Sequence, residues 1–144
     1  FRTFTDPAIA NQASNLVTLC AACHHKAEIS VMVRSGLAAA AYALRSIAPL
    51  LIMCDREDVS LLSENRSILN DANPAILIYD NIPGGIGLSR KLFDQRRFWI
   101  ERAIEVIEGC QCESGCPACV GPVGEPGYGG KTEALALLKG LCYG

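Results

Sequence analysis

The pattern of apolar and polar positions along the chain predicts helices combined with short strands. Residues Leu37–Ile47 are rich in alanine and leucine, which predicts a helix that Pro49 stops. Two wholly apolar runs, Leu50–Cys54 and Ala75–Tyr79, are typical of buried strands. Residues 59–73 between them carry a weak helical pattern. These elements predict a mixed α/β fold in which helices cover a small central sheet.

The longest predicted helix follows a glycine-rich turn at 83–87 and ends at Gly109. At about 100° per residue, one broad arc of this helix is apolar and the opposite arc is charged. The apolar arc contains Leu88, Leu92, Phe93, Trp99, Ile100, Ala103, Ile104, Val106 and Ile107. Phe98 falls among the charges, whereas Tyr42, Phe93 and Trp99 are expected in the core. A last amphipathic helix is predicted at about 132–141.

Composition narrows the class of protein. The chain has 144 residues, of which 50% are hydrophobic, and a net charge of -2, which argues for one folded domain and against disorder. A pI near 5.7 excludes a simple polybasic nucleic-acid binder. Apolar runs such as Ile47–Cys54 are too short to span a membrane, so we expect no membrane partner. Because the chain starts with Phe1, we expect a fragment of a larger protein.

Eight cysteines are the unusual feature of the composition. Four of them form the spacing C-x-C-x3-C-x2-C within ten residues, at Cys110, Cys112, Cys116 and Cys119. Four thiolates around one ion are typical of a closed, structural zinc site. Two disulfides or an iron–sulfur cluster are the alternatives. Clustered cysteines favour metal binding in a reducing compartment, so we expect a cytoplasmic protein that binds zinc.

Three motifs in order resemble the zinc-binding C-terminal domain of mitomycin-repair-type DEAD/DEAH-box helicases. They are residues 48–59, residues 79–88 and residues 110–120, with the sequences APLLIMCDREDV, YDNIPGGIGL and CQCESGCPACV. The resemblance implies that the four cysteines above bind zinc. It also implies an accessory domain, at residues 36–144, that aids DNA engagement or docking in DNA repair. Its partners would be a superfamily 2 helicase core in cis and DNA.

The N-terminal segment, residues 1–35, carries a partial Cys/His motif. Residues 15–25 resemble the second half of an HNH-type zinc knuckle, with Cys20, Cys23 and His24 as candidate ligands. The first half of such a knuckle is missing, because residues 1–19 contain neither cysteine nor histidine. Two interpretations remain open. The segment is either part of a second metal site, completed by Cys54, Cys142 or a histidine, or a truncated knuckle. A metal-dependent nuclease or hydrolase is the alternative function.

An acidic edge is the other candidate site. Asp55 and Asp80 each follow a predicted strand, and Asp58 and the Gly84-Gly85 turn lie nearby in the sequence. If the two strands are parallel neighbours, these residues meet at the carboxyl edge of the sheet, where open α/β sheets bind ligands. The alternative is that the aspartates cap turns and helices.

Two other patterns resemble functional motifs only in part. Lys131 and Thr132 follow glycines as in a phosphate-binding loop, but Glu125 stands where that motif needs its first glycine. This segment is therefore expected to be a loop and a helix start, and the chain alone is not expected to hydrolyse ATP. Basic residues along the long helix alternate with acids, which favours a solvated face over a stripe that tracks phosphates.

Overall fold

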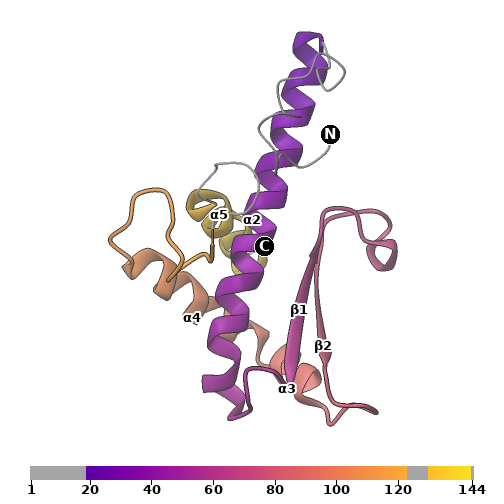
Figure 1. Cartoon of the computed structure of the whole chain (residues 1–144), viewed down its shortest axis with the longest axis vertical. Coiled ribbons are helices and arrows are strands. Elements are labelled where there is room, and N and C mark those ends of the chain that lie inside the picture. Colours follow the sequence, from indigo (N-terminus) through magenta and orange to yellow (C-terminus); the bar gives the residue numbers. More distant parts are fainter. Residues whose placement is uncertain (1–18, 123–129, 144) are drawn as a thin grey trace, which may run out of the picture.

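The long helix α2, Ala21–Ile52, is the element against which the other elements pack. The computed structural model describes residues 19–122 and 130–143. A β-hairpin lies on one side of α2, and the helices α4 and α5 lie on the other (Figure 1). The remaining elements in chain order are β1 (Val59–Glu64), η2 (Ile68–Asn70), β2 (Ala75–Asp80), α3 (Leu88–Asp94), α4 (Arg96–Gly109) and α5 (Lys131–Tyr143). The predicted combination of helices with a small sheet is confirmed.

Helix α2 is much longer than the sequence pattern predicted. It includes residues 50–52, so the prediction of a strand at Leu50–Cys54 was wrong, and it continues past Pro49. A proline in the last turn removes only one helical hydrogen bond, and the buried side chains of Ile47 and Ile52 favour continuing the helix. The helix ends at Ile52, and the cap residue Met53 has a left-handed backbone (φ 53°) and donates its N–H to the Pro49 carbonyl at 3.0 Å.

The sheet is an antiparallel hairpin of β1 and β2, with Val59 opposite Asp80 and Glu64 opposite Ala75. The strand predicted at 75–79 is confirmed, but the helical pattern predicted at 59–73 is wrong. That segment forms β1 and the short η2 because pairing with β2 satisfies its backbone, which a weak local helical pattern does not predict. Because residues 50–52 are helical and β2 pairs antiparallel with β1, the parallel crossover between strands at 50–54 and 75–79, on which the acidic-edge hypothesis depended, is not formed.

The predicted long helix is two helices, α3 and α4, separated at Gln95 (φ -101°, ψ 16°). The end at Gly109 is confirmed. Trp99 is buried as predicted, and its indole N–H donates to the Leu44 carbonyl at 2.9 Å, which joins α4 to α2. Phe93 was expected inside but is 54% exposed, because the break changes the rotation of α3 relative to α4.

Helix α5 packs against α2 at a glycine. A Cβ added at Gly36 would lie 2.9 Å from the Glu133 Cβ, so the two helices approach each other too closely there for a larger residue. Ala134 and Leu138 of α5 are fully buried in the same core. Helix α2 is continuous through residues 35 and 36, the expected boundary between the N-terminal segment and the accessory domain.

Within the described residues, one helix, α2, is long and apolar enough to cross a membrane by length and composition alone. An 18-residue window of α2 has a mean hydropathy of 1.4. The expectation of no membrane partner rested on uninterrupted apolar runs, and polar residues interrupt this window. The core helix of a folded domain passes the same test, and 56% of that window is buried inside the structure. The pattern of α2 is therefore also that of a central core helix.

Candidate metal centre

The four clustered cysteines lie directly after α4, where the chain turns back toward α5. Cys110 caps the end of α4 in an extended conformation (φ -76°, ψ 129°), which directs the chain away from the helix axis. Gly115 has φ 120°, a conformation that favours glycine, and reverses the chain between the two cysteine pairs. The N–H groups of Cys119 and Val120 donate to the Cys116 carbonyl at 3.1 and 3.0 Å and close the second turn.

The sulfur atoms of these cysteines, which we call the cysteine quartet (Cys110, Cys112, Cys116 and Cys119), lie within 4.8 Å of one another. The Sγ–Sγ distances are 3.6 Å for Cys110 and Cys116, 3.5 Å for Cys112 and Cys119, and 3.7 Å for Cys116 and Cys119. A tetrahedral zinc with Zn–S bonds of about 2.3 Å places its sulfurs about 3.8 Å apart. The quartet therefore fits one tetrahedral ion.

The same distances exclude the two alternatives considered for the quartet. A disulfide has an S–S bond of about 2.05 Å, and all eight cysteines are free. Sulfurs as close as 3.5 Å leave space for one ion but not for a cluster of several iron and sulfide atoms.

The surroundings of the quartet shift the pKa values of two of its cysteines in opposite directions. The backbone amides of Cys119 and Ala118 lower the pKa of Cys116, which favours its thiolate. Burial raises the pKa of Cys119, which is only 2% exposed, and so favours its neutral thiol. A thiolate at Cys119 therefore needs a compensating positive charge, which a bound divalent ion supplies.

Lys131, the first residue of α5, contacts the quartet and was not identified from the sequence. Its Nζ donates to the carbonyl oxygens of Cys110 and Cys112 at 2.6 and 2.7 Å and lies 3.9 Å from the Cys112 sulfur. The helix predicted at about 132–141 is confirmed and begins one residue earlier, at Lys131. The sequence shows only a lysine near the start of the last predicted helix, because its position beside the sulfurs depends on how α5 packs.

The N-terminal candidates Cys20, Cys23 and His24 lie at the exposed beginning of α2. Cys20 is the N-cap residue, and its carbonyl accepts the N–H of His24 at 2.8 Å. In residues 19–122 and 130–143, only the quartet forms a group of three or more potential metal ligands. Cys54 follows the opposite end of α2, about 50 Å away at 1.5 Å per residue, so it does not complete a site with Cys20. Residues 15–18 of the knuckle-like segment lie outside the described residues.

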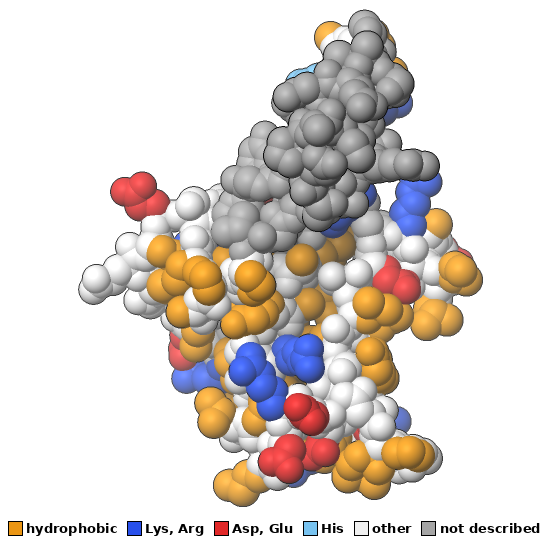
Figure 2. All heavy atoms as spheres, in the orientation of Figure 1, with side chains coloured by type: hydrophobic (Ala, Val, Ile, Leu, Met, Phe, Trp, Pro, Cys, Tyr) orange, Lys and Arg blue, Asp and Glu red, His pale blue; other side chains and the backbone are white. Residues whose placement is uncertain are grey.

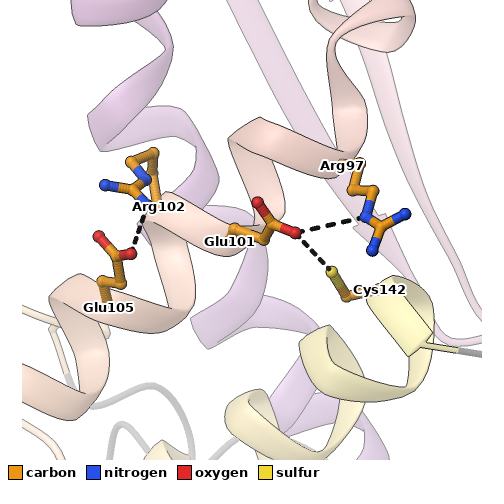
Figure 3. A network of polar contacts seen from close by, with 5 residues as sticks. All are labelled: Arg97, Glu101, Arg102, Glu105 and Cys142. Atoms are coloured by element: carbon orange, nitrogen blue, oxygen red, sulfur yellow. Dashed lines mark hydrogen bonds and ion pairs between the residues drawn. The ribbon is translucent and has the colours of Figure 1, made fainter.

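Cys142, the other candidate for completing that site, lies on α5 beside α4. Its sulfur is 3.8 Å from a carboxylate oxygen of Glu101, which also accepts from Arg97 at 3.3 Å (Figure 3). This thiol is therefore part of the α4–α5 contact.

Residues of the predicted acidic edge lie at one end of the hairpin, where the Asn81 N–H donates to the Asp58 carbonyl at 2.8 Å, but the carboxylates of Asp80 and Asp58 are each bonded within their own turn. The Asp80 carboxylate accepts four backbone N–H groups of the turn into α3, at 2.6–3.1 Å. The hydrogen bonds from Ser89 and the other amides hold the pKa of Asp80 well below its usual range. Asp58 accepts the N–H of Asp55 at 2.9 Å in the turn after α2. These contacts are those of capping aspartates, the alternative interpretation.

Gly84 and Gly85 have φ of 88° and 66°, so they form the tight turn before α3. A Cβ at Gly85 would lie 3.6 Å from the Asp80 carboxylate. The amides that follow this turn donate to a carboxylate of the chain itself.

The basic residues of α3 and α4 are largely paired with acids of the same helices. Figure 2 shows Lys or Arg side chains close to Asp or Glu side chains on the lower part of the described face. The pairs are Arg90–Asp94 at 3.1 Å, Arg97–Glu101 at 3.3 Å and Arg102–Glu105. This pairing favours the solvated-face interpretation over a stripe that tracks phosphates.

Comparisons with known proteins agree with the site. Residues 40–120 match the family model of the MrfA Zn-binding domain (MZB). The ATP-dependent helicase YprA of Bacillus subtilis, described as uncharacterized, is 40% identical over 95 residues, which are 66% of this chain and 12% of the helicase. The uncharacterized protein MJ1572.1 of Methanocaldococcus jannaschii is 30% identical over 77 residues, which are 51% of this chain and 68% of that protein.

Among solved structures, the crystal structure of the DUF1998 helicase MrfA bound to DNA superposes with a TM-score of 0.70 at 34% identity. The match covers 78% of this chain and 15% of the helicase. The family match spans more than half of the chain and ends just after the last cysteine of the quartet. The chain therefore belongs to the family of MrfA Zn-binding domains.

Proposed function

We propose that the chain is the zinc-stabilised accessory domain of a superfamily 2 DEAD/DEAH-box DNA helicase. In this proposal Cys110, Cys112, Cys116 and Cys119 are the four ligands of one zinc ion. The observation that carries it is the convergence of four sulfurs, within 4.8 Å of one another, in the segment matched to a zinc-binding family. Four protein ligands leave no open coordination position, so the ion would stabilise the fold and would not activate water.

The proposed partners are a helicase core in the same polypeptide and DNA. Two relatives support this: YprA is described as an ATP-dependent helicase, and the matched MrfA structure contains DNA. The chain spans only 12% of YprA, so the motor would lie in other parts of the protein. We infer that the domain aids DNA engagement or docking onto the core, as part of cytoplasmic DNA repair.

The nuclease alternative is not favoured. In the part of the chain that the structure describes, Cys20 and Cys23 lie at an exposed helix end and belong to no converging group of three or more ligand atoms, and Asp80 acts as a cap. The relatives that carry a functional description are helicases.

The proposal is tested in the full-length protein that carries this chain. A Cys112→Ser, Cys119→Ser variant should lose zinc and unwind DNA more slowly, because the domain no longer holds its shape. A Cys20→Ser, Cys23→Ser variant is the matched control and should unwind at the normal rate. Unwinding, DNA-stimulated ATP hydrolysis and the salt dependence of DNA binding are measured for each. Unchanged unwinding and DNA binding in a zinc-free, folded variant would contradict the accessory role.

A further inference from the structure

Lys131 occupies an unfavourable place for a cation in its own helix. It is the first residue of α5, and the N-terminus of a helix carries a partial positive charge that disfavours lysine. An acidic residue of the first turn, Glu133, is the kind of residue that favours this end. The side chain of Lys131 must therefore be stabilised by groups outside α5.

Those groups belong to the cysteine quartet. A lysine ammonium has three N–H donors. Three acceptors surround Nζ: the Cys110 carbonyl at 2.6 Å, the Cys112 carbonyl at 2.7 Å and, at a longer 3.9 Å, the Cys112 sulfur. The Cys110 carbonyl also lies at the C-terminal, partially negative end of α4. Four thiolates around one divalent ion leave a net negative charge, which an adjacent ammonium offsets.

The backbone of the same residue is attached to the turn between the cysteine pairs. The N–H of Lys131 donates to the Ser114 carbonyl at 3.3 Å. The preceding Gly130 lies against α2, where an added Cβ would approach the Ser35 carbonyl to 3.2 Å. The start of α5 therefore lies between α2 and the quartet.

We propose that Lys131 is a positioning residue of the zinc centre, which fixes the Cys110–Cys112 segment and links metal occupancy to the docking of α5. The proposal rests on the quartet being the zinc ligand set. Lys131 lies outside the segment matched to the family, which ends at residue 120. Residues that hold metal ligands from outside typically change metal affinity by about 10- to 100-fold when they are replaced.

The test is zinc affinity measured by competition with a chelator on the whole chain. Lys131→Gln removes the charge and should weaken zinc binding by about 10- to 100-fold. Lys131→Arg keeps the charge and should lie closer to the wild type. Lys139→Gln is the matched control on the same helix, because Lys139 pairs with Glu108 at 2.6 Å instead of the cysteines, and it should bind zinc normally.

Hydrogen exchange supplies the second readout. In Lys131→Gln with zinc bound, amides of the first turns of α5 should exchange faster, while those of α2 around Leu44 should stay protected. Wild-type zinc affinity in Lys131→Gln would overturn the role of Lys131 at the zinc centre, and wild-type exchange at the start of α5 would overturn its link to the docking of that helix. An arginine variant as weak as the glutamine variant would overturn the role of its charge.

A different result is expected if the quartet is not the zinc ligand set. If Cys112→Ser binds zinc as tightly as the wild type, the quartet is not the site, and the proposal for Lys131 fails with it. If Cys112→Ser loses zinc while Lys131→Gln binds normally, the ligand set stands and only the role of Lys131 is contradicted.

Discussion

The spacing Cys-x2-Cys occurs twice in this chain, and the two copies have different surroundings. Cys116 and Cys119 lie in a tight turn between helices, where a second pair of sulfurs converges on them. Cys20 and Cys23 lie at the exposed start of α2, and the described residues bring no further cluster of ligands to them. The Cys-x2-Cys spacing points two sulfurs at one place, and the rest of the fold must supply the other two ligands.

The largest difference between the two copies should appear when the metal is removed. A strong chelator should lower the Tm of the chain steeply, because structural zinc contributes apparent free energies of about 10–16 kcal/mol in small zinc peptides. The loss of protection should begin at the end of α4 and the start of α5. Calorimetry and hydrogen exchange with and without chelator measure both effects.

The control for metal removal is a Cys20→Ser, Cys23→Ser variant, which should melt like the wild type and respond equally to the chelator. A Tm that falls in this variant as far as in the chelated wild type would break the distinction between the two copies.

The second largest effect on stability is expected where the segment after the quartet packs against α2. Gly121 follows the quartet with φ 87°, and an added Cβ would lie 2.7 Å from the Tyr42 ring. Gly121→Ala should therefore destabilise the fold by about 1–3 kcal/mol, through strain and overpacking. Gly109→Ala, where a Cβ meets open space, should be neutral or slightly stabilising. Denaturant unfolding of both variants measures this, and equal stability would contradict the attachment.

The turn into α3 is a third candidate site that the chain fills with its own carboxylate. Because the folded-state pKa of Asp80 is lowered, its stabilising contribution is present above the unfolded value of about 3.9 and is lost as the pH falls below it. Asp80→Asn should therefore be less stable than the wild type at pH 7, and the difference should shrink below about pH 4. Thermal melts across this range test it, and a pH-independent difference would contradict the charge of Asp80 as the cause.

The smallest effect concerns thiol reactivity at the N-terminal copy. A backbone hydrogen bond from Cys23 lowers the pKa of the exposed Cys20, so it should alkylate at a lower pH than an ordinary cysteine. Burial, together with Asp58 and Asp55, raises the pKa of Cys54, which should react more slowly and at higher pH. Mass spectrometry of alkylated peptides measures both. Equal alkylation rates for Cys20 and Cys54 would contradict this prediction. Early alkylation of the quartet in the zinc-loaded protein would contradict the difference between the two Cys-x2-Cys copies.

The sequence predicted features that depend on neighbouring residues better than features that depend on distant ones. The quartet, the strand at β2 and the helix end at Gly109 follow from local spacing and turn residues. Strand β1 and the continuation of α2 past Pro49 depend on partners elsewhere in the fold, so the local pattern misled. Lys131 reaches cysteines 19 and 21 positions away, which only the docking of α5 brings about.

The most direct test of the central claim is the zinc content of the purified chain, measured by elemental analysis per polypeptide. One zinc is expected in the wild type and in the Cys20→Ser, Cys23→Ser variant, and none in the Cys112→Ser, Cys119→Ser variant. Zinc retained in the quartet variant, or lost in the N-terminal variant, would contradict the assignment of the metal centre to Cys110, Cys112, Cys116 and Cys119.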